Sequence, residues 1–142
     1  MIPRTHTNRI IWHHSLTDTG DVNSFRHYHM HFNGYEDIGY HAVILRDGTI
    51  QHGRDIRMIG AHAKGKNYDS IGVCLVGDFR YYEPSADQLS GCVQYVHMLS
   101  HSVAWTHPLK NEFHRPEWTP NACPGKMLNR KDFLEIVLGG YL

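Results

Sequence analysis

The sequence predicts an α/β fold with one central mixed β-sheet flanked by helices, and a single domain that spans residues 1–142. Three observations lead to this prediction. A chain of 142 residues can bury one sizeable core but is short for two domains. Apolar, β-branched runs alternate with segments of helical periodicity, which is typical of a sheet covered by helices. One pair of runs is joined by a tight turn, so part of the sheet must be antiparallel.

Two segments are the strongest candidates for buried strands. Residues 9–13 are short, apolar and β-branched, and residues 70–76 are almost wholly apolar. Between them, residues 56–69 contain small residues, a histidine and an asparagine, which favours an irregular loop.

A hairpin is expected in the middle of the chain. Residues 38–45 and 50–54 flank a turn that has Asp47 and Gly48 at its centre. Asp-Gly between two apolar runs is a strong hairpin signal. Tyr40 is therefore expected at the start of a strand, where a half-buried aromatic residue is also common.

Apolar residues recur at intervals of three and four in three segments, which predicts amphipathic helices over residues 22–33, 85–101 and 130–138. The second helix has Ser85 as a candidate N-cap, with Gln88 at the capping-box position. Residues 103–113 are polar and aromatic, and we expect them to form a connection.

Composition excludes several functional classes. Fourteen basic and fourteen acidic side chains cancel without a basic run, so no nucleic-acid partner is indicated. No apolar stretch approaches the ~18 residues of a membrane span, and the N-terminus lacks the apolar core of a signal peptide. We therefore expect a protein made in the cytoplasm. Three distant cysteines argue against a disulfide framework, and Cys74 and Cys92 lie in apolar runs typical of buried thiols.

The segment from His114 to Lys126 predicts a metal site. Eight residues separate His114 from Cys123, and three prolines in this segment exclude a regular helix. A stiff loop can bring an imidazole and a thiolate together, and this pair of ligands suits Zn²⁺. A third ligand must come from elsewhere, and His13 or His14, at the end of the first strand, is the obvious donor. Neighbouring strand residues point to opposite faces, so one of the two faces a given metal.

The chain has thirteen histidines, and most must serve other purposes. His27, His29 and His31 alternate along a predicted helix, where residues two apart diverge by ~200° and cannot converge on one ion. His97 and His101 are one helical turn apart and could bind a metal, but an exposed helix face also explains them.

At this point the motifs, taken together and in order, resemble a known family. They cover about residues 9–128, and each is weak alone. The motifs are Ile-Trp-His13-His-Ser, Gly-Tyr40-His, Arg-Asp-Gly-Thr, Gly-Arg54-Asp, Ala-His62-Ala-Lys-Gly, Asn67, Ser-Ile-Gly-Val-Cys-Leu-Val-Gly and His114 followed by Ala-Cys123-Pro-Gly. This combination resembles the type 2 zinc N-acetylmuramoyl-L-alanine amidases, a family that includes short phage lysozymes and peptidoglycan recognition proteins. The compact length is most similar to a phage or prophage endolysin.

The resemblance implies one Zn²⁺ per chain, held by His13, His114 and Cys123. It also implies catalytic roles for Tyr40 and for the residue two before the cysteine.

That residue is a lysine in the phage lysozymes and is Asn121 here. The His-to-Cys spacing is one residue longer than usual. Thr119 and Lys126 are therefore alternatives for the second catalytic role. His62, Asn67 and Thr119 are the expected substrate-binding residues, and His62 could instead orient the site.

Three functional hypotheses follow. The first is hydrolysis of the amide between N-acetylmuramic acid and L-alanine in bacterial peptidoglycan, by a monomer that acts on the cell wall after release. The second is a zinc-bearing protein that binds peptidoglycan without turnover, as the loss of the lysine at Asn121 suggests. The third is a structural zinc domain, which would require a fourth protein ligand because structural sites are closed.

Overall fold

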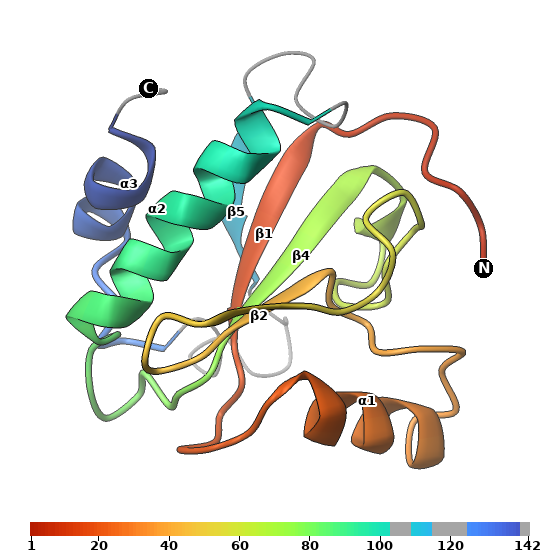
Figure 1. Cartoon of the computed structure of the whole chain (residues 1–142), viewed down its shortest axis with the longest axis horizontal. Coiled ribbons are helices and arrows are strands. Elements are labelled where there is room, and N and C mark those ends of the chain that lie inside the picture. The colour runs from red at the N-terminus through yellow and green to blue at the C-terminus, as the bar shows by residue number, and fades with distance from the viewer. Residues whose placement is uncertain (103–108, 115–124, 140–142) are drawn as a thin grey trace.

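The computed structural model describes residues 1–102, 109–114 and 125–139 (Figure 1). These residues form a five-stranded mixed sheet in the order β3-β2-β4-β1-β5, with helices on both sides. The elements are β1 (Arg9–His14), α1 (Val22–His31), β2 (Ala42–Ile44), β3 (Ile50–His52), the 3-10 helix η1 (Asn67–Asp69), β4 (Ser70–Leu75), α2 (Ala86–Ser100), β5 (Lys110–Phe113) and α3 (Arg130–Leu138). The predicted fold class is confirmed.

The sheet is parallel at its centre and antiparallel at one edge. β1 runs parallel to both β4 and β5, and β2 runs parallel to β4. β2 and β3 form the predicted hairpin, with the Thr49 carbonyl accepting a hydrogen bond from the Leu45 amide across the turn. Gly48 has φ of 89° in this turn, a conformation that glycine adopts without strain.

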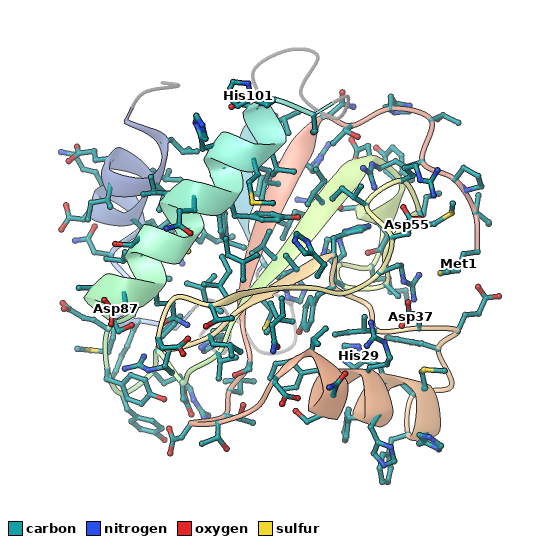
Figure 2. All side chains as sticks on the ribbon, in the orientation of Figure 1. Met1, His29, Asp37, Asp55, Asp87 and His101 are labelled. Carbon is teal, nitrogen blue, oxygen red and sulfur yellow. The ribbon has the colours of Figure 1, made fainter. Side chains whose placement is uncertain are left out.

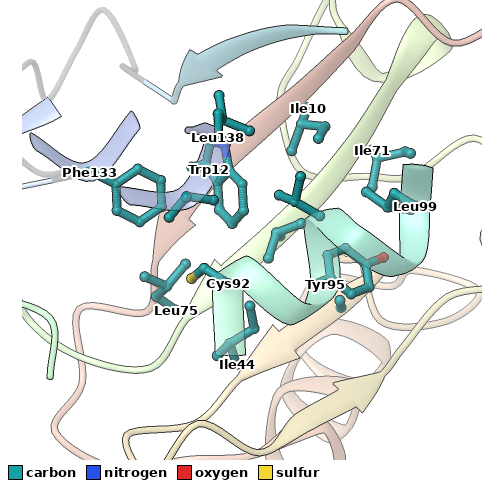
Figure 3. Close-up of a cluster of buried hydrophobic side chains, with 14 of the residues drawn as sticks. Ile10, Trp12, Ile44, Ile71, Leu75, Cys92, Tyr95, Leu99, Phe133 and Leu138 are labelled. Carbon is teal, nitrogen blue, oxygen red and sulfur yellow. The ribbon is translucent and has the colours of Figure 1, made fainter. Parts of the chain in front are cut away.

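One face of the sheet carries the main core (Figure 3). Alternate residues of β1 and β4 point towards α2 and α3, because successive strand side chains point to opposite faces. At the centre, the fully buried Trp12 contacts Phe133 of α3 edge to face, with ring centroids 5.0 Å apart. Its indole N–H donates to Asn111 of β5, so this large side chain is buried without losing a hydrogen bond.

The predicted helices form, with one correction. Ser85 caps α2 by accepting a hydrogen bond from the Gln88 amide. The side chain of Gln88 does not complete a capping box. It is fully buried and donates to the carbonyls of Ile44 and Val76, at the end of the sheet. A glutamine at this position is compatible with either arrangement, and the nearby strand ends offer it acceptors that the sequence does not reveal.

Two strands differ from expectation. β2 begins at Ala42 rather than at residue 38, so Tyr40 precedes the strand. Residues 110–113, expected to be part of a connection, form the edge strand β5. The polar sequence Lys-Asn-Glu-Phe hides this strand, because an edge strand needs little apolar surface.

Among the helices within the described ranges, none is both long and apolar enough to cross a membrane.

Candidate active site

The end of β1 separates the two adjacent histidines. His14 points to the core face, where its ring stacks on Phe79 and its Nδ1 accepts a hydrogen bond from the Phe79 amide at 3.0 Å. His13 points to the opposite face, and its side chain is 3% exposed. The two histidines therefore have different surroundings, and His14 serves the packing around Phe79.

Three rings converge around that of His13. Its ring centroid lies 5.1 Å from that of Tyr40, 4.9 Å from that of His62 and 4.7 Å from that of His114. The Nε2 atom of His13 is within hydrogen-bond distance of Nδ1 of His62, at 2.8 Å. These residues come from four distant parts of the sequence, so the fold itself assembles the cluster.

Strand pairing places His114 in this cluster. β5 pairs with β1 so that Phe113 lies opposite Trp12, and a histidine comes next in the sequence in both cases, His13 within β1 and His114 directly after β5. The His114 amide donates to the Trp12 carbonyl at 3.0 Å, which continues the ladder by one step. The edge strand that the sequence concealed is therefore the element that brings His114 beside His13.

His62 occupies a space left by a glycine. A Cβ atom on Gly72 of β4 would meet the His62 ring at about 2.5 Å, so only glycine allows the ring to lie against the sheet. The Oδ1 atom of Asn67 accepts hydrogen bonds from the amides of His62 and Ala63 and fixes the surrounding loop. Asn67 thus has a direct structural role in addition to the substrate-binding role predicted for it.

The histidines of the cluster are held in the neutral form. Burial lowers the pKa of His13 well below its ordinary value, and the neighbouring His62 and His114 lower it further. Burial is also the main reason that the pKa values of His62 and His114 are lowered. Neutral imidazole is the form that binds a metal. The donor chemistry of His13 and His114 therefore fits a zinc ion.

A chain of charges that the sequence motifs do not reveal lies beside the cluster. Arg9 bridges Asp69 and Glu112, with both ion pairs at 3.0 Å, and Lys66 also pairs with Glu112, at 2.9 Å. Lys66 contributes to lowering the pKa of His114. The alternation of side chains along β5 is the signal that could have placed Glu112 and His114 on one face, once the strand was recognised.

Several predicted site residues lie outside the described residues, namely Thr119, Asn121 and Cys123. Lys126 lies within them and is exposed. In the part of the chain that the structure describes, no three His, Cys, Asp or Glu side chains are arranged to hold a metal. The structure thus brings together two of the three predicted zinc ligands.

The other histidines remain outside this cluster. His27 and His31 are exposed on α1 with ring centroids 4.3 Å apart, and His97 and His101 form a similar pair at the end of α2, 4.6 Å apart. His29 is half-buried and faces Tyr40 at 5.4 Å, so the expectation of solvated or partly packed helix histidines is confirmed. Cys74 and Cys92 are buried free thiols, as expected.

Comparison with known proteins identifies the family. Residues 3–126 match the N-acetylmuramoyl-L-alanine amidase family. The endolysin of Enterobacteria phage K11 is 35% identical over 132 residues, which cover 89% of this chain and 86% of that protein. The endolysin of Enterobacteria phage T3 is 47% identical over 78 residues, which cover 53% of this chain and 51% of that protein.

A similarity of structure agrees with this result. The N-acetylmuramoyl-L-alanine amidase LysC from Clostridium intestinale superposes with a TM-score of 0.76, at 22% identity, over 91% of this chain and 83% of that chain. At this identity the likeness concerns the fold, and the family assignment rests on the sequence matches. The chain belongs to the N-acetylmuramoyl-L-alanine amidase family.

Proposed function

We propose that this protein hydrolyses the amide bond between N-acetylmuramic acid and L-alanine in bacterial peptidoglycan, as a phage or prophage endolysin. The proposal includes one Zn²⁺ per chain, held by His13, His114 and Cys123. It is carried by the convergence of His13 and His114, whose rings lie 4.7 Å apart at the ends of adjacent strands. When bound, zinc supplies Lewis acidity that polarises the scissile carbonyl and makes water nucleophilic near neutral pH.

His62 is suited to orient His13. Metal-binding histidines commonly donate their second ring N–H to a neighbouring acceptor, which fixes the ring and its tautomer. We assign the proton between His13 and His62 to Nε2 of His13, because Nε2 of His62 can then donate to the Ser70 hydroxyl at 3.2 Å. This arrangement leaves Nδ1 of His13 with a lone pair. The orienting role fits His62 better than direct binding of substrate.

Tyr40 is the proposed donor to the oxyanion that forms when the carbonyl is attacked. Its ring contacts His13, and a phenol donates one strong hydrogen bond. One preorganised donor of this kind contributes ~3–4 kcal/mol to transition-state stabilisation. In the second catalytic role, Asn121 donates a neutral hydrogen bond. Such a bond is about half as strong as a charge-assisted one. Thr119 and Lys126 are the alternatives for that role.

The substrate proposal extends to the surroundings of the site. Thr119 and Asn67 are proposed to contact the peptidoglycan stem, Asn67 through its amide N–H groups because Oδ1 already accepts two backbone hydrogen bonds. The protein acts as a monomer on the cell wall.

The products of digestion test this function. An amidase releases the amino group of L-alanine and leaves glycan strands intact, whereas a muramidase produces new reducing sugars. Mass spectrometry of digested peptidoglycan should therefore show free stem peptides and full-length glycans, and a chelator should abolish their release. Shortened glycans would refute the amidase proposal, and binding without products would instead support a recognition protein.

A pair of variants tests the catalytic roles. Tyr40→Phe should keep zinc and fold but lose about 10²–10³ in kcat, as for removal of one preorganised donor. Asn121→Ala should have a much smaller effect on the same substrate. The opposite ranking, with zinc content unchanged, would assign the main catalytic role to Asn121 and leave Tyr40 as a packing residue.

A further inference from the structure

Tyr40 lies just before β2, and the sheet holds this segment at the next residue, His41, whose amide donates to the Gly72 carbonyl of β4. β2 starts at Ala42, so the position of Tyr40 depends on contacts made by the residues around it. Its carbonyl accepts a hydrogen bond from the Arg54 amide, and the Gly39 carbonyl accepts one from the Ala61 amide. These bonds fix the carbonyl side of the segment, and the Gly39 amide requires a separate acceptor.

His29 provides that acceptor from α1. Its Nδ1 atom accepts a hydrogen bond from the Gly39 amide at 2.9 Å. The same ring contacts the Tyr40 ring, with centroids 5.4 Å apart and planes inclined by 54°. Tyr40 thus contacts His29 as well as His13, whose ring centroid is 5.1 Å away. Figure 2 shows His29 on the side of α1 that faces the rest of the domain.

The surroundings of His29 keep its ring neutral, so that Nδ1 can accept the hydrogen bond from Gly39. Burial and the nearby Arg54 guanidinium lower the pKa of His29, so the ring is neutral near pH 7 and Nδ1 keeps its lone pair. The Gly39 backbone packs closely against the next loop, because a Cβ atom there would lie 2.0 Å from the Ala61 carbonyl oxygen. Loss of the His29 ring nitrogen would therefore leave the amide of this closely packed residue without the acceptor that it has in the structure.

We propose that His29 is a positioning residue for catalysis, which holds Tyr40 against the His13 cluster through its ring and through the Gly39 amide. This inference rests on the proposed role of Tyr40 as the oxyanion donor. It concerns a helix residue that contributes no zinc ligand. Because the donor must be placed within a fraction of an ångström of the developing charge, a small displacement of Tyr40 affects kcat more than KM.

Three variants of α1 test the proposal. His29→Phe keeps an aromatic ring beside Tyr40 but removes the acceptor, whereas His29→Asn restores an acceptor oxygen near the position of Nδ1. His31→Phe introduces the same side chain at an exposed position of the same helix. With a soluble N-acetylmuramoyl peptide as substrate, His29→Phe should lower kcat about 10-fold with KM and zinc content unchanged, since a misplacement of about 1 Å can lower the rate by up to 10²-fold. His29→Asn should recover most of this loss, and His31→Phe should match wild type.

A double-mutant cycle separates positioning from general destabilisation. If His29 acts through Tyr40, His29→Phe should have little further effect on kcat in a Tyr40→Phe background, because coupled residues are not additive. Equal fold-losses in both backgrounds, or full activity of His29→Phe beside an impaired Tyr40→Phe, would overturn the inference. If Tyr40→Phe itself retains full activity, the proposed catalytic role of Tyr40 fails instead, and the two failures are thereby distinguished.

Discussion

Replacing Arg54 with methionine should destabilise the fold strongly. The described hydrogen bonds of its guanidinium all go to backbone carbonyls, and none goes to a carboxylate. Arg54 is 7% exposed, and its three nitrogens donate to the carbonyls of Ile38, Ile59 and Asp37 at 2.8, 2.9 and 3.1 Å. These bonds tie the segment before Tyr40 to the loop that leads to His62. Methionine fills a similar volume but leaves the carbonyls without these donors.

The magnitude follows from those three acceptors. Each buried carbonyl left without its partner costs about 1–3 kcal/mol. Part of this loss is offset, because the methionine variant no longer has to take a guanidinium charge out of water on folding. We therefore expect Arg54→Met to lower the free energy of unfolding by about 3–5 kcal/mol, or the melting temperature by roughly 10–17 °C. Urea unfolding followed by tryptophan fluorescence measures this change, provided that the m-value stays constant.

Arg57→Met is the matched control. Its guanidinium is 74% exposed and pairs with Asp55, two residues away, so its loss should leave the unfolding curve within error of wild type. Equal stability of the two variants would refute the reasoning, because it would mean that the hydrogen bonds of Arg54 contribute no more than an exposed ion pair.

Two further predictions concern buried titratable groups. His41 is 1% exposed and burial lowers its pKa to about 4, so the folded state binds fewer protons than the unfolded state below pH 6.5. His41 alone should therefore make the metal-free protein less stable by up to about 3 kcal/mol as the pH drops from about 6.5 to 4, and His41→Asn should remove this share of the pH dependence in urea titrations. Burial raises the pKa of the Cys92 thiol. Iodoacetamide at pH 8 should leave Cys92 unmodified in the native protein and label it after unfolding, and rapid native labelling would contradict its burial.

The sequence was informative where local chemistry decides the structure. Apolar β-branched runs located the two central strands, Asp47-Gly48 located the hairpin, and a capping residue with an apolar stripe located α2. In each case the signal lies within a few neighbouring residues, and burial in the fold reinforces it.

The predictions from sequence were wrong where tertiary contacts decide the local structure. β5 has a polar sequence, and only its pairing with β1 makes it a strand. The Gln88 side chain was assigned to a cap, but the strand ends of Ile44 and Val76 offered it buried acceptors.

The site was predictable as a set of residue types but not as an arrangement. Local reasoning left His13 and His14 as alternatives, and the resemblance to the amidases selected His13. The structure places His13 in the cluster with His114 and places His14 against Phe79. The role of His29 could not be predicted, because its contact with Gly39 depends on how α1 packs against the segment before β2.

The most direct test of this account compares zinc content in two variants that carry the same substitution at adjacent positions. His13→Asn should lose the zinc ion and the amidase activity. His14→Asn should keep one zinc per chain, because an asparagine oxygen can still accept the hydrogen bond from the Phe79 amide. Elemental analysis of the folded, purified variants gives the result. Retention of zinc by His13→Asn, together with its loss from His14→Asn, would contradict the proposed site.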